Sequence, residues 1–153
     1  MKPLKPFYAN RPNIKVSVAQ RPSGPIVHVI FKLESIKHIN FKTTSLDKLW
    51  LNTCFETFEF DNNSDQYVEW NFNANGEAKT YLFSSYRKQI KQLNIDLHTK
   101  ASTYDNSFKL SVDLPKFFKN STLKNTTVIK LNNNSYNYYA ESHPLDKPDF
   151  HKA

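Results

Sequence analysis

Apolar and polar residues alternate with a period of two in several short segments of the chain. The clearest segments are residues 14–18, 27–33, 68–72, 93–97 and 108–114. A period of two predicts strands that turn one face toward a core and the other toward solvent. No long segment shows the period of about 3.6 residues that marks an amphipathic helix. The pattern therefore predicts an all-β chain.

Turn-forming residues separate these segments at regular intervals. They fall at residues 22–25, 61–65, 73–76, 103–106 and 132–135. Asn75-Gly76 is the strongest of these signals, because both residues tolerate the positive φ of a tight hairpin. The chain holds only 2 glycines, so we expect asparagine to supply many of the turns that need positive φ. Short strands at this spacing predict an antiparallel β-sandwich or barrel.

Two stretches interrupt the alternation. Residues 35–47 predict a long connection, and residues 115–120 predict one short helical turn. The sequence shows no internal repeat and no interdomain linker. A length of 153 residues favours one domain that spans residues 1–153.

A polar strand face accompanies the apolar one in the central part of the chain. Glu69 and Asn71 are two residues apart and so share a face, opposite the side that holds Trp70. Glu56 lies in the preceding strand-like run, residues 49–58. Arg87 ends the next one, where it could pair with either glutamate. Carboxylate, amide and guanidinium groups beside aromatic rings suit a polar, ring-shaped ligand.

Three runs of residues in this region, and one near the end of the chain, resemble those of a known family. They are Trp50-x-x-Thr53-Cys54-Phe55-Glu56-x-Phe58, Glu69-x-Asn71-Phe72-x-x-x-Gly76, Tyr81-x-Phe83-x-x-Tyr86-Arg87 and the segment Tyr138 to His151. They resemble DOMON-like proteins, which are related to family 9 carbohydrate-binding modules. The resemblance implies a β-sandwich of jelly-roll or immunoglobulin-like form. It also implies a ligand, a sugar in most cases and haem in some relatives.

We expect non-catalytic binding of a carbohydrate or similar polar small molecule. The candidate ligand-binding residues are Glu56, Glu69, Asn71 and Arg87 as hydrogen-bonding groups, with Trp50 or Tyr81 as a stacking platform. An internal ion-pair network that fixes strand register is the alternative for Glu56, Glu69 and Arg87. Alternation assigns Trp70 to the core. For Trp50 a core position is favoured over a rim position.

Three other functions stay open from the residues alone. One is a protein-interaction or structural module, which the absence of catalytic motifs allows. Another is a metal-dependent or paired-carboxylate enzyme that uses Glu56 and Glu69. The third is a haem- or metal-binding domain. Met1 is the only methionine, so haem bound through Met and His is not expected. A bis-histidine site would draw on His28, His38, His98, His143 or His151.

Metal ligands are few and weakly patterned. His143, Asp149 and His151 are candidates for a transition metal, but a packed closing segment is favoured for these residues. Asp61, Asn62, Asn63 and Asp65 offer oxygen ligands for calcium without a recognised loop spacing. We therefore expect no bound cofactor, with calcium as the alternative.

The charge and the apolar runs exclude several classes of partner. The net charge is +7, yet the lysines are scattered, so we expect no nucleic-acid site. No run approaches the roughly 18 apolar residues of a membrane span, and the start of the chain lacks a secretory signal, so a cytoplasmic protein is expected. Cys54 is the only cysteine and is expected to be a buried, inert thiol.

Overall fold

The computed structural model describes residues 1–9 and 11–152 and consists almost entirely of antiparallel strands. Its elements are β1 (Lys2–Pro6), β2 (Lys15–Ser23), β3 (Ile26–Glu34), the short 3-10 helix η1 (Leu49–Leu51), β4 (Cys54–Asp61), β5 (Tyr67–Phe72), β6 (Ala78–Ser85), β7 (Lys88–Leu93), β8 (His98–Tyr104), β9 (Ser107–Pro115), β10 (Ser121–Lys130) and β11 (Tyr136–Ala140). The predicted all-β class is confirmed.

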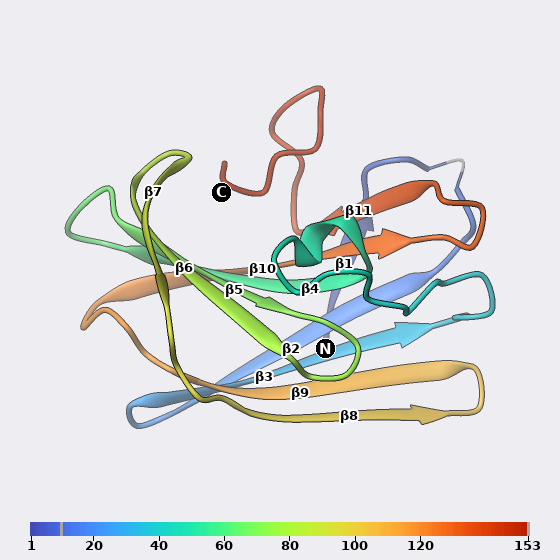
Figure 1. Cartoon of the computed structure of the whole chain (residues 1–153), viewed down its shortest axis with the longest axis horizontal. Coiled ribbons are helices and arrows are strands. Elements are labelled where there is room, and N and C mark those ends of the chain that lie inside the picture. Colours follow the sequence, from blue (N-terminus) through green and yellow to red (C-terminus); the bar gives the residue numbers. More distant parts are fainter. Residues whose placement is uncertain (10, 153) are drawn as a thin grey trace.

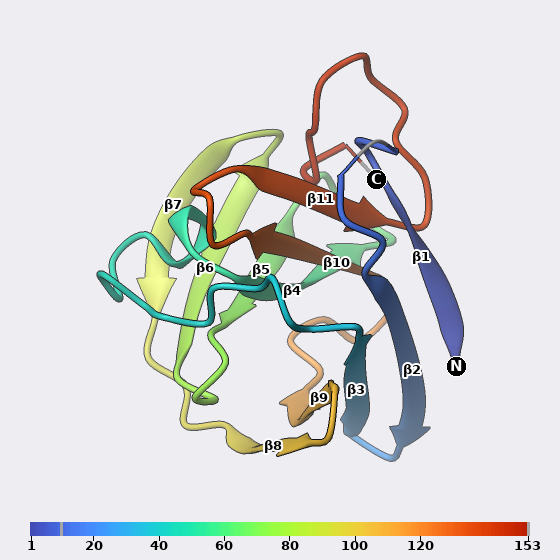
Figure 2. The same ribbon diagram turned by 90° about the vertical axis from the view of Figure 1, so that its right-hand side faces the viewer.

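The strands form two sheets that pack as a sandwich, shown in Figure 1. Their hydrogen-bonded order is β7-β6-β5-β4-β10-β11-β1-β2-β3-β9-β8. Strand β1 joins the two sheets, because Lys2 to Leu4 pair with β2 whereas Lys5 and Pro6 pair with β11. Figure 2 shows β1 running beside both sheets. The sheet of β4, β5, β6, β7, β10 and β11 is called the site sheet below, and the sheet of β2, β3, β8 and β9 the opposite sheet.

The core lies between the two sheets and follows the predicted alternation. In β3, Val27, Val29, Phe31 and Leu33 are buried, and their intervening neighbours are half-buried. Trp70 is fully buried in the same core, as predicted. Apolar alternation thus placed the inward faces of β2, β3, β5 and β9 correctly.

The strand predicted at 93–97 is not formed. Strand β7 ends at Leu93, and the chain then crosses from the site sheet to the opposite sheet before β8 begins at His98. Leu93, Ile95 and Leu97 still pack against the core. The alternation therefore reports burial correctly, although a crossing segment has no neighbouring strand with which to pair.

The helical turn predicted at 115–120 is also absent. Residues 117–120 form bends that lead into β10. The backbone N–H groups of Phe117 and Phe118 donate instead to the Glu59 carboxylate at 3.0 Å. A carboxylate that accepts these donors replaces the hydrogen bonds of a helical turn. The long connection predicted at 35–47 is confirmed.

Most predicted turns are present, but asparagine supplies few positive-φ positions. Gly76 has φ of 81° in the turn after β5, as expected. Among the described residues, the non-glycine positions with positive φ are Ser35, Arg87, Asp105 and Asn134. Only one of the four is an asparagine. The expectation that asparagine supplies many of the positive-φ turns is therefore wrong.

Strands β4 and β5 are buried on both faces, which the sequence did not predict. Every residue of β5 is buried, including Tyr67, Glu69 and Asn71 on the face turned away from the sandwich core. The C-terminal segment 146–152 lies over this outer face of the site sheet (Figure 1). The polar face identified in the sequence is therefore enclosed beneath a loop.

Candidate functional site

A cavity of about 490 Å³ lies between the outer face of the site sheet and the C-terminal segment. Its floor holds Glu56 from β4 and Glu69 from β5. Its walls are mostly aromatic and come from η1, β4, β6, β11 and the C-terminal segment. These residues are Trp50, Phe58, Tyr81, Phe83, Tyr136, Tyr138 and Phe150. The volume is in the range of small-molecule sites.

The cavity brings together five of the six predicted ligand-binding residues. Glu56, Glu69, Arg87, Trp50 and Tyr81 all line it. The sixth, Asn71, is fully buried beside the floor and donates from Nδ2 to Glu69 Oε1 at 3.1 Å. Asn71 therefore orients a lining carboxyl group.

The two glutamates are diagonal neighbours on adjacent strands. Glu56 pairs in register with Asn71, and Glu69 pairs with Phe58. Both point outward because they share the parity opposite to the inward-facing residues of β4 and β5. Glu56 Oε2 accepts a hydrogen bond from the Thr126 hydroxyl of β10 at 2.9 Å.

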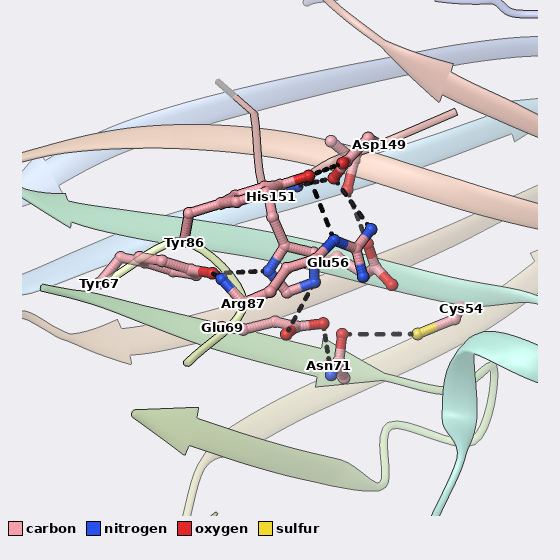
Figure 3. Close-up of polar contacts among 10 residues, drawn as sticks. Cys54, Glu56, Tyr67, Glu69, Asn71, Tyr86, Arg87, Asp149 and His151 are labelled. Carbon is pink, nitrogen blue, oxygen red and sulfur yellow. Dashed lines mark hydrogen bonds and ion pairs between the residues drawn. The ribbon is translucent and has the colours of Figure 1, made fainter. Parts of the chain in front are cut away.

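Arg87 pairs with Asp149 and not with either glutamate, as Figure 3 shows. Its Nη2 lies 3.0 Å from Asp149 Oδ1. The Tyr86 hydroxyl donates to the other oxygen of Asp149, and Arg87 Nε donates to the Tyr86 oxygen at 3.3 Å. The predicted pairing of Arg87 with Glu56 or Glu69 is therefore wrong. The sequence interval of 62 residues between Arg87 and Asp149 gave no sign of this contact.

His151 connects the C-terminal segment to the cavity floor. The Tyr67 hydroxyl accepts from the Arg87 backbone N–H at 3.0 Å and lies 2.8 Å from His151 Nδ1. Because its oxygen already accepts, the hydroxyl proton is free to donate to Nδ1. The proton of the neutral imidazole then resides on Nε2, which faces Glu69 Oε2 at 3.8 Å.

Burial dominates the electrostatics of this site. It raises the pKa of Glu56 to about 8, with repulsion from Glu69 adding to the effect. It raises the pKa of Glu69 to about 7, although Asn71 and Arg87 oppose the shift. Burial, with the nearby Arg87 charge, lowers the pKa of His151 to about 4. Near neutral pH Glu56 is therefore mainly protonated and Glu69 about half protonated, below an uncharged imidazole.

Asp149 behaves in the opposite way. Burial alone would raise its pKa, but hydrogen bonds from Tyr86 and Arg87 leave the pKa below its usual value. Asp149 therefore stays ionised and neutralises Arg87. The ion pair fixes the β6–β7 turn against the C-terminal segment.

Trp50 forms part of the wall and is not a core residue, contrary to the favoured expectation. It is 41% exposed at η1, whereas Trp70 is 0% exposed. Its ring meets the Tyr81 ring edge-to-face at a centroid distance of 6.4 Å. On β11, Tyr136 and Tyr138 stack at 6.4 Å. Such rings offer apolar faces to a bound ring.

The weak metal candidates do not form a cluster. His143 Nε2 lies 2.8 Å from the Lys5 carbonyl and packs on Phe7, while Asp149 and His151 contact each other at the cavity. Within residues 1–9 and 11–152, no group of three His, Cys, Asp or Glu side chains has the spacing to hold a metal ion.

The residues considered for calcium form a surface turn. Asp61 accepts hydrogen bonds from the Asn63 backbone and the Ser64 hydroxyl. Asn62 bonds with Asn120. These hydrogen bonds are those of a surface turn.

Sequence reasoning missed Tyr136 of β11 and the position of the C-terminal segment at the cavity. Asp149 and His151 are expected in a packed closing segment, with metal binding as the alternative, whereas both line the cavity. Phe58 could have been found, because it follows Glu56 by two residues and so shares its face. Cys54 is free and fully buried as expected, and burial raises the pKa of its thiol well above the usual value.

Comparisons with known proteins find structures of similar fold but no relative by sequence. No protein-family model and no curated protein sequence matches the chain. A solved structure of a putative carbohydrate-binding protein from Bacteroides uniformis matches with a TM-score of 0.71 and 15% identity, over 98% of this chain and 80% of that one.

Two structures of a family 9 carbohydrate-binding module from Caldicellulosiruptor kristjanssonii also match. The complex with glucose has a TM-score of 0.58 and 7% identity, over 88% of this chain and 70% of the module. The complex with cellotriose has a TM-score of 0.61 and 7% identity, over 91% and 71%. The predicted sandwich of family 9 type is thereby confirmed as a fold.

In the described part of the chain, no helix has the length and apolar character needed to cross a membrane.

Proposed function

We propose that the cavity over the site sheet binds a carbohydrate without chemically changing it. The observation that carries this proposal is the composition of the cavity, in which aromatic walls surround a polar floor of Glu56 and Glu69. A pyranose ring has apolar faces and a rim of hydroxyl groups, so it needs both kinds of surface. The fold similarity to modules solved with glucose and cellotriose supports the same ligand class.

Each wall residue has a definite part in this proposal. Trp50 and Tyr81 supply exposed and buried aromatic surface on one side of the cavity, and the stacked Tyr136 and Tyr138 supply the other. The Arg87 side chain is 54% exposed and can donate to sugar hydroxyls while it stays paired with Asp149. The DOMON-like resemblance adds to the proposal only as far as it overlaps with family 9 modules.

Tryptophan fluorescence offers a direct test. Trp50 lies on the cavity and Trp70 is buried in the sandwich core, so a ligand in the cavity should perturb the emission of Trp50 alone. We expect titration with glucose and with cello-oligosaccharides to shift the emission of the wild-type protein. Trp50→Phe should remove most of the signal, and isothermal calorimetry should then show weakened binding.

Tyr104→Phe is the matched control, because Tyr104 is 84% exposed on β8 in the opposite sheet. It should bind as the wild type does. If no member of a panel of neutral and amino sugars binds to the folded wild-type protein, the proposal is wrong.

A further inference from the structure

The carboxyl groups of the cavity floor have no cationic partner. Glu56 is 3% exposed and Glu69 is 6% exposed. In the described part of the chain, neither forms an ion pair with lysine or arginine, since Arg87 is paired with Asp149. A buried carboxylate without a counter-charge is costly, so burial in the free site favours the protonated form of both groups.

Both carboxyl groups line the cavity. Glu56 Oε2 accepts a hydrogen bond from the Thr126 hydroxyl, and the Cys54 thiol also hydrogen-bonds to the Glu56 carboxyl group. Glu69 Oε1 accepts from Asn71, and Glu69 Oε2 lies 3.8 Å from His151 Nε2, beyond normal hydrogen-bond distance. A carboxylate has about four lone-pair sites, so each group can still accept from a ligand.

The walls favour an organic cation in the same place. Trp50, Tyr81 and Tyr138 surround the floor, and aromatic faces attract an ammonium group by cation–π interaction. A bare metal ion would need several oxygen or nitrogen ligands, which these rings do not supply.

We infer that the site is built for a sugar that carries a free ammonium group, held between Glu56 and Glu69 while the ring packs on the aromatic walls. This inference rests on the proposed carbohydrate function and names the class of sugar. The ammonium group supplies the positive charge that the floor lacks. A neutral sugar would fill the same volume but would bring no positive charge to Glu56 and Glu69.

Binding of such a ligand should release a proton. The titratable groups around the two glutamates are Cys54, Tyr67, Tyr81, Arg87, Tyr138, Asp149 and His151. The charges of Asp149 and Arg87 cancel, and His151 is uncharged. Burial keeps the thiol and phenol groups neutral near pH 7. The glutamates alone can then respond, so one of them loses its proton when the ammonium enters.

The net charge of +7 only weakly opposes the binding of an ammonium group in the cavity. Surface charges are screened over about 8 Å at physiological ionic strength, whereas an ammonium in the cavity meets the carboxyl groups directly. Long-range repulsion slows the approach of a cation more than it weakens the bound state.

Calorimetry at about pH 6.5 in two buffers of different ionisation enthalpy tests the inference. The probes are glucosamine, N-acetylglucosamine, glucose, ethanolamine and calcium chloride. We expect glucosamine to bind about tenfold more tightly than glucose or N-acetylglucosamine, with release of about one proton. Ethanolamine, which has the ammonium without the ring, should bind more weakly than glucosamine.

Variants identify the groups that respond. Glu56→Gln and Glu69→Gln keep the shape of the floor, and each should reduce the preference for glucosamine over glucose and the proton release. Glu34→Gln, at the end of β3 in the opposite sheet, where the side chain is 47% exposed, is the matched control and should change neither.

The possible outcomes separate this inference from the proposed function. Binding of glucose with equal or weaker binding of glucosamine overturns the inference and leaves carbohydrate binding intact. Failure of every sugar overturns both. Equal binding of ethanolamine and glucosamine, or stoichiometric calcium at the floor, also overturns the inference, because the site would then recognise charge without a sugar ring.

Discussion

Burial of Glu56 and Glu69 makes the stability of the protein depend on pH. Burial raises the pKa of both groups above the ordinary value of 4.5, so the folded protein holds protons that the unfolded chain releases. The stability associated with these protons is complete below about pH 4.5 and is lost as the pH rises through the folded values near 7 and 8.

Glu56→Gln should remove much of the stability loss that occurs as the pH rises. The amide imitates the protonated carboxyl group, so we expect the variant to be about 2 kcal/mol more stable relative to wild type at pH 8 than at pH 5. Urea unfolding at several pH values measures the difference. Glu34→Gln serves as the control and should follow the wild-type profile. Parallel profiles for Glu56→Gln and wild type would contradict the raised pKa.

Arg87 combines a strained backbone with a side chain that lines the cavity. Its φ of 56° lies in the left-handed region, which costs a non-glycine residue roughly 1 kcal/mol. The turn is held by the Arg87 ion pair to Asp149 and by the Arg87 backbone N–H that donates to Tyr67. Strain at this position is compatible with a site that needs the guanidinium placed in the cavity.

A pair of substitutions separates the two contributions. Arg87→Gly and Arg87→Ala both remove the ion pair, but only glycine relieves the backbone strain. We therefore expect Arg87→Gly to be about 1 kcal/mol more stable than Arg87→Ala by thermal or urea unfolding. Both should bind sugar more weakly than wild type. Equal stability of the two variants would show that the turn relaxes when the side chain is lost.

At the scale of elements, alternation predicts strands in which apolar residues face the core and polar residues face outward, and it misses strands without that pattern. It identified β2, β3, β5 and β9. It missed β8, whose residues are nearly all exposed and which is held by backbone pairing with β9. An edge strand of this kind leaves no hydrophobic signature in the sequence.

The segment between β9 and β10 has its own anchor in Glu59. This carboxylate is 2% exposed and accepts from the backbone of Phe117 and Phe118 and from the Ser121 hydroxyl. Glu59→Gln replaces one acceptor oxygen by an amide that cannot accept. We expect the variant to lose about 1–3 kcal/mol of unfolding free energy, together with faster amide exchange at residues 117 and 118.

The exchange measurement distinguishes a local role from a general one. Protection in β3 should fall no more than global stability requires, whereas the 117–118 amides should lose protection beyond that amount. Unchanged protection at these two amides would contradict the anchoring role of Glu59. Glu34→Gln is again the matched control because its carboxylate is exposed.

For the whole molecule, the sequence predicts the strand residues of the cavity floor but not the C-terminal segment that covers them. Glu56, Glu69 and Asn71 follow from strand alternation, because residues two apart share a face. The covering segment does not follow from any local pattern. Asp149 and His151 reach the site through contacts with Arg87 and Tyr67, residues far away in the sequence. Such docking depends on the assembled sheet, which single-sequence periodicity cannot describe.

The C-terminal segment covers aromatic surface that is separate from the sandwich core. Phe58, Tyr67, Tyr81 and Phe83 form their own cluster on the outer face of the site sheet, against which Phe150 packs. The inter-sheet core includes no residue beyond Tyr139 in the part of the chain that the structure describes. The sandwich should therefore tolerate loss of the covering segment.

Truncation after Leu145 tests this division. We expect the shortened protein to keep its β-sheet circular dichroism and a cooperative unfolding transition, with a lower midpoint because buried aromatic surface becomes exposed. It should bind a hydrophobic dye more strongly and lose sugar binding, since Asp149, Phe150 and His151 leave the cavity wall. Truncation after His151 removes no wall residue and is the control. An unfolded protein after the longer deletion would show instead that the segment supports the sandwich itself.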